Sequence, residues 1–299
     1  MTLTALLLII LASSGVGLMG ELIKVYQVKN GTGIISTVLF MLFFNVIAAA
    51  GGLAFSEALT LSLPGIGMAL VFAVAALVTA VLCLVGTAWG NVSVIVACAM
   101  LGKLILPSAY GMIVLPEENV MTIAKGFGFL FAFITLFLNF VPDKSGKKNE
   151  HALKFKLACL IVFFTQGSAL IIYNLVTRMG LAGNGFVTLY MAISAILTGI
   201  AILVAYCKNK NAFQVELKNS FSKTSVLIII GYAVLNFVSD KLSLTCSGMV
   251  PLIFQAPVEF CVPILVIALI DFIIYREKLT KRQLVQLLTA FLSCGCFLI

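Results

Sequence analysis

Apolar residues fill ten long runs of this chain, and short polar segments separate the runs. The runs cover residues 2–20, 33–55, 64–87, 91–113, 121–141, 154–177, 185–206, 224–242, 249–273 and 281–299. About 20 residues of α-helix are enough to cross the roughly 30 Å hydrocarbon core of a bilayer. The pattern therefore predicts an all-α polytopic membrane protein with ten transmembrane helices.

The composition points to the same class. Of the 299 residues, 62% are hydrophobic and only 10% are charged, and the mean hydropathy is +1.18. A water-soluble globule of this size needs much more polar surface. The first run has no basic start and no clear cleavage pattern, so we expect a retained helix and not a secretory signal.

The basic residues predict an orientation in the membrane. The net charge is +8, but the bases lie in short loops beside apolar runs, so we expect a lipid bilayer and no nucleic acid as their partner. If the loops alternate between the two sides, Lys125, Arg178 and Lys241 lie on one side, and all other bases except Lys103 lie on the opposite side. Since basic loops stay in the cytoplasm, a multi-pass protein of the cell membrane with both termini outside is predicted.

The longest polar segment, 142–156, divides the ten runs five and five. The two halves begin alike, since Gly31-Thr-Gly33 opens the second run and Gly183-Asn-Gly185 opens the seventh. Tandem halves with an odd number of spans must insert in opposite orientations, as in many secondary transporters. We therefore predict two inverted five-helix repeats, 1–141 and 154–299, joined by a central loop at 142–153.

Two ionisable residues, Lys103 and Glu259, lie deep inside apolar runs. A charge at that depth costs roughly 2.5 to 3.5 kcal/mol even on lenient scales, so it normally faces the protein interior or a wet cavity. Each is followed four residues later by a proline, Pro107 or Pro263, which leaves the carbonyl of the charged residue without its helical donor. Pro257 adds a further break. We expect the charges to mark a substrate or proton pathway and the three prolines to act as hinges.

Further polar side chains extend this candidate site. Tyr110 lies seven residues after Lys103, and Gln255 lies four before Glu259, which are spacings that share a helical face. Additional candidates are Asn174 and Trp89. Two alternatives stay open: the two charges can simply pair with each other, although desolvation opposes this, and single polar residues can simply bond to a neighbouring helix. Charges nearer to run ends, including Asp240 and Arg178, are expected to be interfacial anchors.

Each half closes in a similar way, with a glutamate-containing turn around Glu117 and Glu277 before a last helix that carries small residues. This arrangement, the length and the midpoint break resemble the EamA-like family of the drug/metabolite transporter superfamily, over essentially the whole chain. The resemblance implies two inverted five-helix repeats, with four helices of each around a central cavity and the fifth outside. It also implies cytoplasmic termini, against the charge pattern.

Together these features predict a secondary active transporter that works by alternating access. We expect it to export a small polar or amphipathic metabolite, amino-acid-like or drug-like, with possible proton coupling, because the sequence has no GxxxxGK[ST] nucleotide-binding loop. The alternatives are an importer of a small organic cation or other nutrient, and a non-transporting membrane protein.

An enzyme, a cofactor and a metal site are not expected. The sequence has no GxSxG elbow and no cluster of His, Asp and Glu residues. The eight cysteines show no CxxC spacing, and His151 is the single histidine. A monomer or homodimer is consistent with the small residues of the closing helices.

Overall fold

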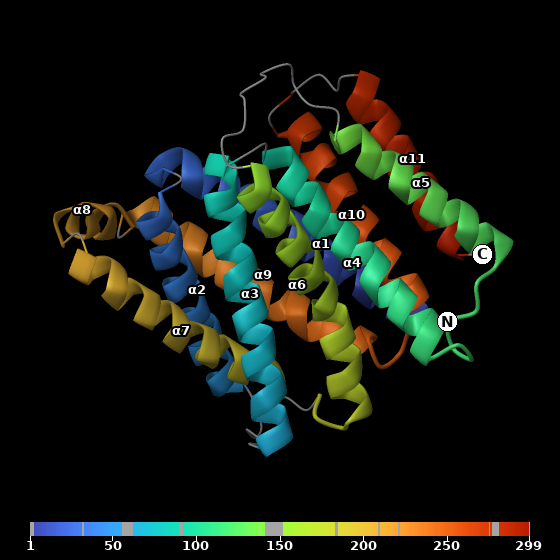
Figure 1. The fold of residues 1–299 in the computed structure, drawn as a ribbon, viewed down its shortest axis with the longest axis horizontal. Coiled ribbons are helices and arrows are strands. Elements are labelled where there is room, and N and C mark those ends of the chain that lie inside the picture. Colours follow the sequence, from blue (N-terminus) through green and yellow to red (C-terminus); the bar gives the residue numbers. More distant parts are fainter. Residues whose placement is uncertain are drawn as a thin grey trace.

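The computed structural model describes residues 3–31, 33–55, 62–89, 92–140, 152–182, 185–208, 210–220, 222–274, 276 and 281–298. In these ranges the chain forms eleven α-helices and no β-strand (Figure 1). Their bounds are α1 (Leu3–Asn30), α2 (Ile34–Phe55), α3 (Leu63–Trp89), α4 (Val92–Val114), α5 (Ile123–Phe140), α6 (Ala152–Arg178), α7 (Phe186–Lys208), α8 (Lys210–Ser220), α9 (Lys223–Cys246), α10 (Leu252–Ile273) and α11 (Lys281–Leu298).

Each predicted apolar run overlaps one of these helices, and α8 is an additional helix that the apolar pattern did not indicate. Seven described helices, α1, α2, α3, α6, α7, α9 and α10, are long and apolar enough to cross a membrane. The chain is therefore a multi-pass α-helical membrane protein. The predicted central loop falls mostly in 141–151, which lies outside the described residues.

Several helices extend past the apolar runs that predicted them. α1 continues to Asn30 and α9 continues to Cys246, and buried polar side chains in these extensions bond within the protein, as Asn30 does to Ser225 and Ser243 does to Glu259. The longer α9 places Asp240 nearly two turns inside the helix. The apolar pattern had placed this residue near a span end.

The first helix of each predicted half ends at a glycine in the left-handed region. Gly180 has φ 69° and its N–H bonds to the carbonyl of Thr177, while the Leu181 N–H bonds to that of Val176. This is a Schellman end, which needs a residue that tolerates positive φ. Gly31 has φ 80° and closes α1 with a single bond to Gln27.

Helix packing follows the same plan in both halves. α1 packs against α9 and α10, and correspondingly α6 packs against α3 and α4. α2 contacts α7, α4 contacts α10, and α5 contacts α11. Figure 1 shows α5 and α11 together at one edge of the bundle, and α2 and α7 at the other. α5 and α11 also contact α4 and α10, so the last helix of each half lies on the outside of this group.

Glycines allow the closest of these helix contacts. A Cβ on Gly102 in α4 would lie 2.0 Å from the carbonyl oxygen of Phe163 in α6, and one on Gly167 in α6 would lie 2.5 Å from the carbonyl oxygen of Gly102. The α1–α10 pair corresponds to the α6–α4 pair, and there a Cβ on Gly17 in α1 would lie 3.1 Å from the carbonyl oxygen of Pro263 in α10. Small residues let membrane helices approach until their backbones touch.

Both ends of the described chain lie at the same end of the bundle. Ala5 of α1 and Phe297 of α11 belong to one buried cluster, together with Cys246 and Val250 from the connection between α9 and α10. The opposite end holds the last turn of α1, which Asn30 ties to Ser225 at the start of α9 through a 2.9 Å hydrogen bond.

Candidate functional site

Lys103 and Glu259 come from two helices that pack against each other, α4 and α10. Both side chains are only half-buried, although each lies well inside its helix. The two residues interact electrostatically, but Lys103 has no described carboxylate within the 4.0 Å of an ion pair. The structure therefore places them across from each other without a direct bond.

Neutral donors hold the Glu259 carboxylate. Its Oε1 accepts hydrogen bonds from Ser243 Oγ at 2.9 Å and from Gln255 Nε2 at 2.8 Å. Gln255 is fully buried, and its amide oxygen accepts a 3.1 Å bond from Ser247 Oγ. Because Gln255 lies one turn before Glu259, the predicted shared face brings these two residues into direct contact.

A second carboxylate, Asp240, joins the same region. It lies in α9, where its carboxylate accepts a hydrogen bond from the hydroxyl of Tyr190 in α7. Lys103 also interacts electrostatically with Asp240. Asp240 was expected to be an interfacial anchor, but it lies beside two ionisable residues of the predicted site.

Tyrosines surround this second carboxylate. The buried hydroxyl of Tyr173 in α6 lies close to Asp240 and Tyr190, but it makes no hydrogen bond of normal geometry in the described region. Phe72 of α3 stacks on Tyr173 with ring centroids 5.0 Å apart, and its centroid lies 4.6 Å from that of Tyr190. Tyrosine hydroxyls and aromatic rings beside a carboxylate can supply hydrogen bonds and apolar contacts to a small ligand.

The charges are divided between two groups of helices. α9 and α10 each pack against α1, and these three helices carry Asp240 and Glu259; we call them the Glu259 unit. α3, α4 and α6 pack on one another and carry Lys103 and Tyr173; we call them the Lys103 unit. The candidate site therefore lies where these two units meet, with acids on one side and a base on the other.

The other predicted residues occupy different positions. Pro107, Pro257 and Pro263 are all buried inside their helices. Tyr110 packs against the largest buried apolar cluster. Trp89 is the last residue of α3, and its side chain lies outside the described residues.

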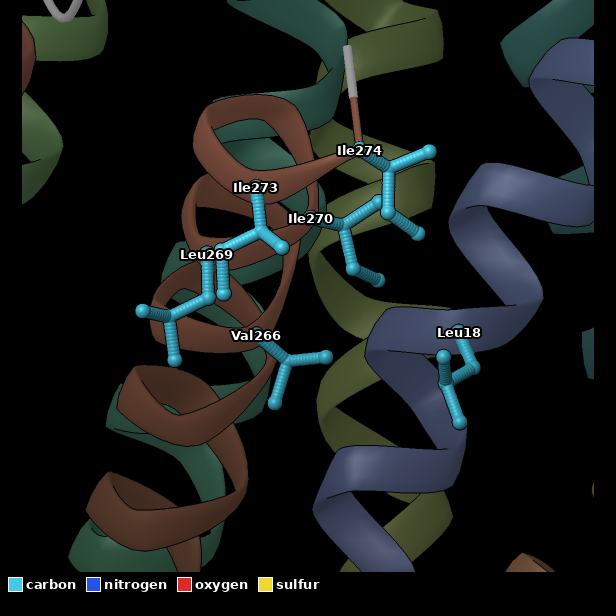
Figure 2. A pocket seen from close by; sticks show the side chains of 6 residues that line it. All are labelled: Leu18, Val266, Leu269, Ile270, Ile273 and Ile274. Atoms are coloured by element: carbon cyan, nitrogen blue, oxygen red, sulfur yellow. The ribbon is translucent and has the colours of Figure 1, made fainter. Parts of the chain in front are cut away.

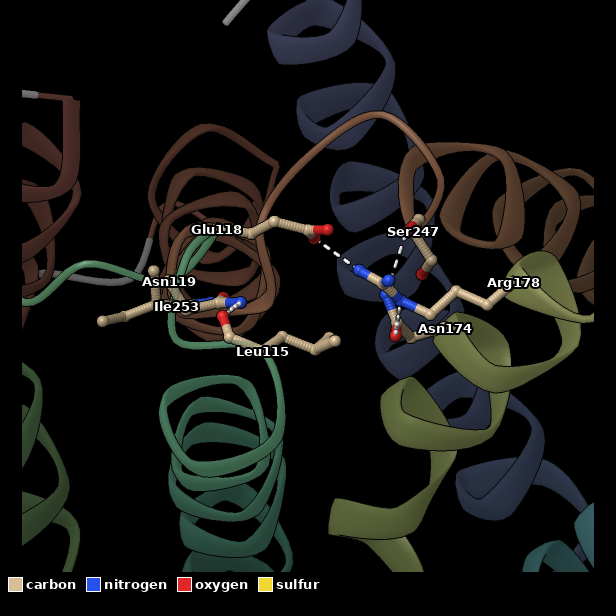
Figure 3. Close-up of polar contacts among 7 residues, drawn as sticks. All are labelled: Leu115, Glu118, Asn119, Asn174, Arg178, Ser247 and Ile253. Carbon is tan, nitrogen blue, oxygen red and sulfur yellow. Dashed lines mark hydrogen bonds and ion pairs between the residues drawn. The ribbon is translucent and has the colours of Figure 1, made fainter.

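Asn174 lies toward the end of the bundle where the termini are, in a polar network (Figure 3). Its Nδ2 donates to the Ser247 carbonyl at 3.1 Å, and its Oδ1 accepts from Arg178 Nε at 2.9 Å. Arg178 in turn pairs with Glu118, which follows α4. Figure 3 shows Glu118 and Arg178 pointing toward each other beside the connection between α9 and α10.

A second hydrogen bond, from the segment after α4, holds the connection between α9 and α10 at the start of α10. Asn119 is buried, and its Oδ1 accepts the backbone N–H of Ile253 at 2.9 Å. We call Glu118, Asn119, Asn174 and Arg178, together with the turn 247–251, the clasp. Since Ser247 also bonds to Gln255, a continuous chain of hydrogen bonds runs from Glu259 to the clasp. The clasp joins the Glu259 unit to the Lys103 unit at one end of the site.

An apolar groove lies apart from these polar groups (Figure 2). It has a volume of about 220 Å³ between α1 and α10, and is lined by Leu18, Val266, Leu269, Ile270, Ile273 and Ile274. Four of these side chains are exposed, which fits contact with lipid. In the part of the chain that the structure describes, no group of three His, Cys, Asp or Glu side chains could hold a metal ion.

Comparison with known proteins identifies the fold but not an activity. No protein-family model matches the sequence, and no curated protein matches it. A crystal structure described only as that of a protein superposes with a TM-score of 0.70 at 12% identity, over 99% of this chain and 96% of that chain. At this identity the likeness shows a shared fold alone. Fold and site together define a multi-pass α-helical membrane protein with ionisable side chains between two packed helix units.

Proposed function

We propose that this protein is a secondary active transporter that exports a small polar or amphipathic metabolite, coupled to protons. The observation that carries the proposal is the site between the two units, where Asp240 and Glu259 are half-buried inside the membrane-length helices α9 and α10, and Lys103 is half-buried inside α4. Ionisable residues at membrane depth are expensive and usually mark a substrate or proton pathway. A non-transporting membrane protein gives no reason to keep three of them together.

The charge of the site favours a substrate that carries an amine. Two carboxylates face one ammonium group, so the site has an excess of negative charge when all three are ionised. An amino-acid-like zwitterion or a small organic cation can place its ammonium near the acids. A substrate carboxylate would then lie near Lys103, with the tyrosines beside the apolar part.

We further propose that all ten long helices cross the membrane as two inverted repeats of the EamA-like kind. The support is the matched packing, in which α1 with α9 and α10 corresponds to α6 with α3 and α4. The glycine-ended first helices add to it. The resemblance in the sequence points to the same superfamily.

Alternating access would move the Glu259 unit against the Lys103 unit. Within each unit the helices are joined by glycine contacts close to backbone distance, whereas the units meet through the packing of α4 against α10 and through the few polar bonds of the clasp. The clasp closes the end of the bundle near the termini. Opening it would expose the site to that side of the membrane.

Transport by purified protein in proteoliposomes tests the proposal. A thermal-shift screen of amino acids, nucleosides and quaternary amines comes first, because a ligand that binds the folded state raises the apparent melting temperature. Flux of each ligand found is then measured with and without an imposed proton gradient. Glu259→Gln, Asp240→Asn and Lys103→Met should each reduce flux at least tenfold.

Matched controls separate the site from general charge effects. Glu117→Gln and Lys154→Met remove the same charges from exposed positions outside the site, and should leave flux within about twofold of wild type. Flux that survives the three site substitutions combined would refute this assignment of the site. A folded protein that binds and moves none of the screened solutes would count against the transporter class.

A further inference from the structure

Exposed lysines gather at the end of the bundle opposite the clasp. Lys29 lies in the last turn of α1, and Lys223 begins α9. The Asn30–Ser225 hydrogen bond holds these two helix ends together. The side chains of both lysines are exposed.

α8 adds two more lysines to this end. Its 11 residues span only about 16 Å at 1.5 Å per residue, too short to cross a bilayer. It contacts α1, α2, α7 and α9. Lys210, Gln214 and Lys218 are exposed and spaced one helical turn apart, so they form one polar face.

The face of α8 next to these polar residues is fixed to the bundle. Phe213 is 8% exposed and belongs to a buried cluster with Val38, Leu39 and Ile202, and Leu217 packs against the same cluster. A short helix with one apolar face held by spanning helices and one basic face outward is typical of an element at the membrane surface. Figure 1 shows α8 at the edge of the bundle, beside α2 and α7.

Tyr206 indicates that this surface lies at the level of the lipid headgroups. It lies near the end of α7, where the apolar run gives way to Cys207 and Lys208, and its ring packs edge-on against Phe213 with centroids 5.3 Å apart. Lys210 Nζ lies 5.9 Å from the centre of the Tyr206 ring. Tyrosine is enriched at the level of lipid headgroups, where its hydroxyl meets water and its ring meets hydrocarbon.

Charge at this end is not balanced by the described carboxylates. Of the acidic side chains that the structure describes, Glu21 belongs to this end, and it is buried with Lys24 3.8 Å away. Lys29, Lys210, Lys218 and Lys223 therefore present positive charge outward. By the positive-inside rule this end faces the cytoplasm, where the leaflet is anionic.

We propose that this basic surface, formed by Lys29, Lys210, Lys218 and Lys223, binds the headgroups of anionic phospholipids. The phosphate would lie against the face of α8 that carries Lys210 and Lys218, with the acyl chains entering the bilayer beside α2 and α7. Each lysine at an anionic membrane surface contributes roughly fivefold to partitioning, so the four together select anionic over zwitterionic lipid.

The test measures lipid binding and needs no substrate. Purified protein in mild detergent is titrated with phosphatidylglycerol or phosphatidylcholine, and both the melting temperature and the number of bound lipids, by native mass spectrometry, are recorded. We expect phosphatidylglycerol to raise the melting temperature more than phosphatidylcholine does. Lys210→Gln with Lys218→Gln should remove at least half of this difference, and Lys29→Gln with Lys223→Gln should act in the same direction.

The control is Lys154→Gln with Lys156→Gln, which removes two exposed lysines from the start of α6 at the same end of the bundle. This double variant should keep the full difference between the melting-temperature shifts with phosphatidylglycerol and with phosphatidylcholine. If the Lys210/Lys218 and Lys154/Lys156 double variants lose the lipid effect equally, the attraction is diffuse over the whole basic end, and the proposed site is overturned. Equal shifts with both lipids would overturn it too, as would a shift reproduced by inorganic phosphate, which would assign a free anion in place of a lipid.

Discussion

Replacing Gly102 with alanine should push α4 away from α6 and destabilise the protein. The new Cβ would lie 2.0 Å from the Phe163 carbonyl oxygen and 2.8 Å from its carbon, and contacts under 3.0 Å are essentially never seen. The obstacle is backbone, so the helices themselves must separate by about 1 Å. Overpacking of this kind costs about 1–3 kcal/mol, and the better helix propensity of alanine offsets about 1 kcal/mol of it. Because the new Cβ meets backbone, which cannot turn aside, we expect the upper end of the overpacking range, about 3 kcal/mol, and hence a net loss of about 2 kcal/mol after the offset.

The assay is thermal unfolding of detergent-solubilised protein, followed as the monodisperse fraction that remains after heating. Domains of 150–250 residues lose about 2–4 °C per kcal/mol, so we expect a fall of roughly 4–8 °C. Gly51→Ala is the control, since a Cβ there meets nothing within 4 Å in α2, and its melting temperature should stay level or rise. If the two variants melt together, backbone contact between α4 and α6 does not hold the Lys103 unit together.

Three further substitutions test graded effects. Gly17→Ala should cost less than Gly102→Ala, because its nearest backbone atom lies at 3.1 Å, and the same heating assay ranks the two. Asn119→Ala should lower stability by about 1–3 kcal/mol, because it leaves the buried Ile253 N–H without an acceptor; Asn119→Asp keeps an acceptor and should melt closer to wild type. Glu118→Gln should change stability by less than about 1 kcal/mol, because its pair with Arg178 is exposed. It should nevertheless speed hydrogen exchange in the turn between α9 and α10; unchanged exchange would show that the pair does not hold the turn.

The sequence predicted the helices well because membrane-length apolar runs leave few alternatives. Lys103 and Glu259 stand out in the sequence as charges inside such runs, and the four-residue spacing correctly put Gln255 next to Glu259. Helix ends were less predictable. Polar termini such as the last turns of α1 and α9 look like loops in a hydropathy pattern, although their backbone stays helical.

Asp240 could not be assigned to the site from the sequence for this reason. With the run taken to end at 242, an acid at 240 looks interfacial, and only the helix continuing to Cys246 moves it inward. Its partner Tyr190 is 50 residues away in the chain. A useful signal was nevertheless present, because Ser239, Ser243 and Ser247 recur every fourth residue around Asp240 and mark a polar stripe on α9.

The relative strength of the contacts decides where the molecule can open. Two buried neutral hydrogen bonds in the clasp are worth about 0.5–1.5 kcal/mol each, and the exposed ion pair adds about 0–1 kcal/mol. The clasp as a whole therefore holds by about 1–4 kcal/mol, below the roughly 5.5 kcal/mol of differential affinity that moves a two-state equilibrium from 1:99 to 99:1. Separating α4 from α6 would instead lose the close backbone packing around Gly102 and Gly167. The clasp therefore contributes little beside the packing of α4 against α10, which also joins the two units, so any movement of one unit against the other has to rearrange this helix pair as well as open the clasp.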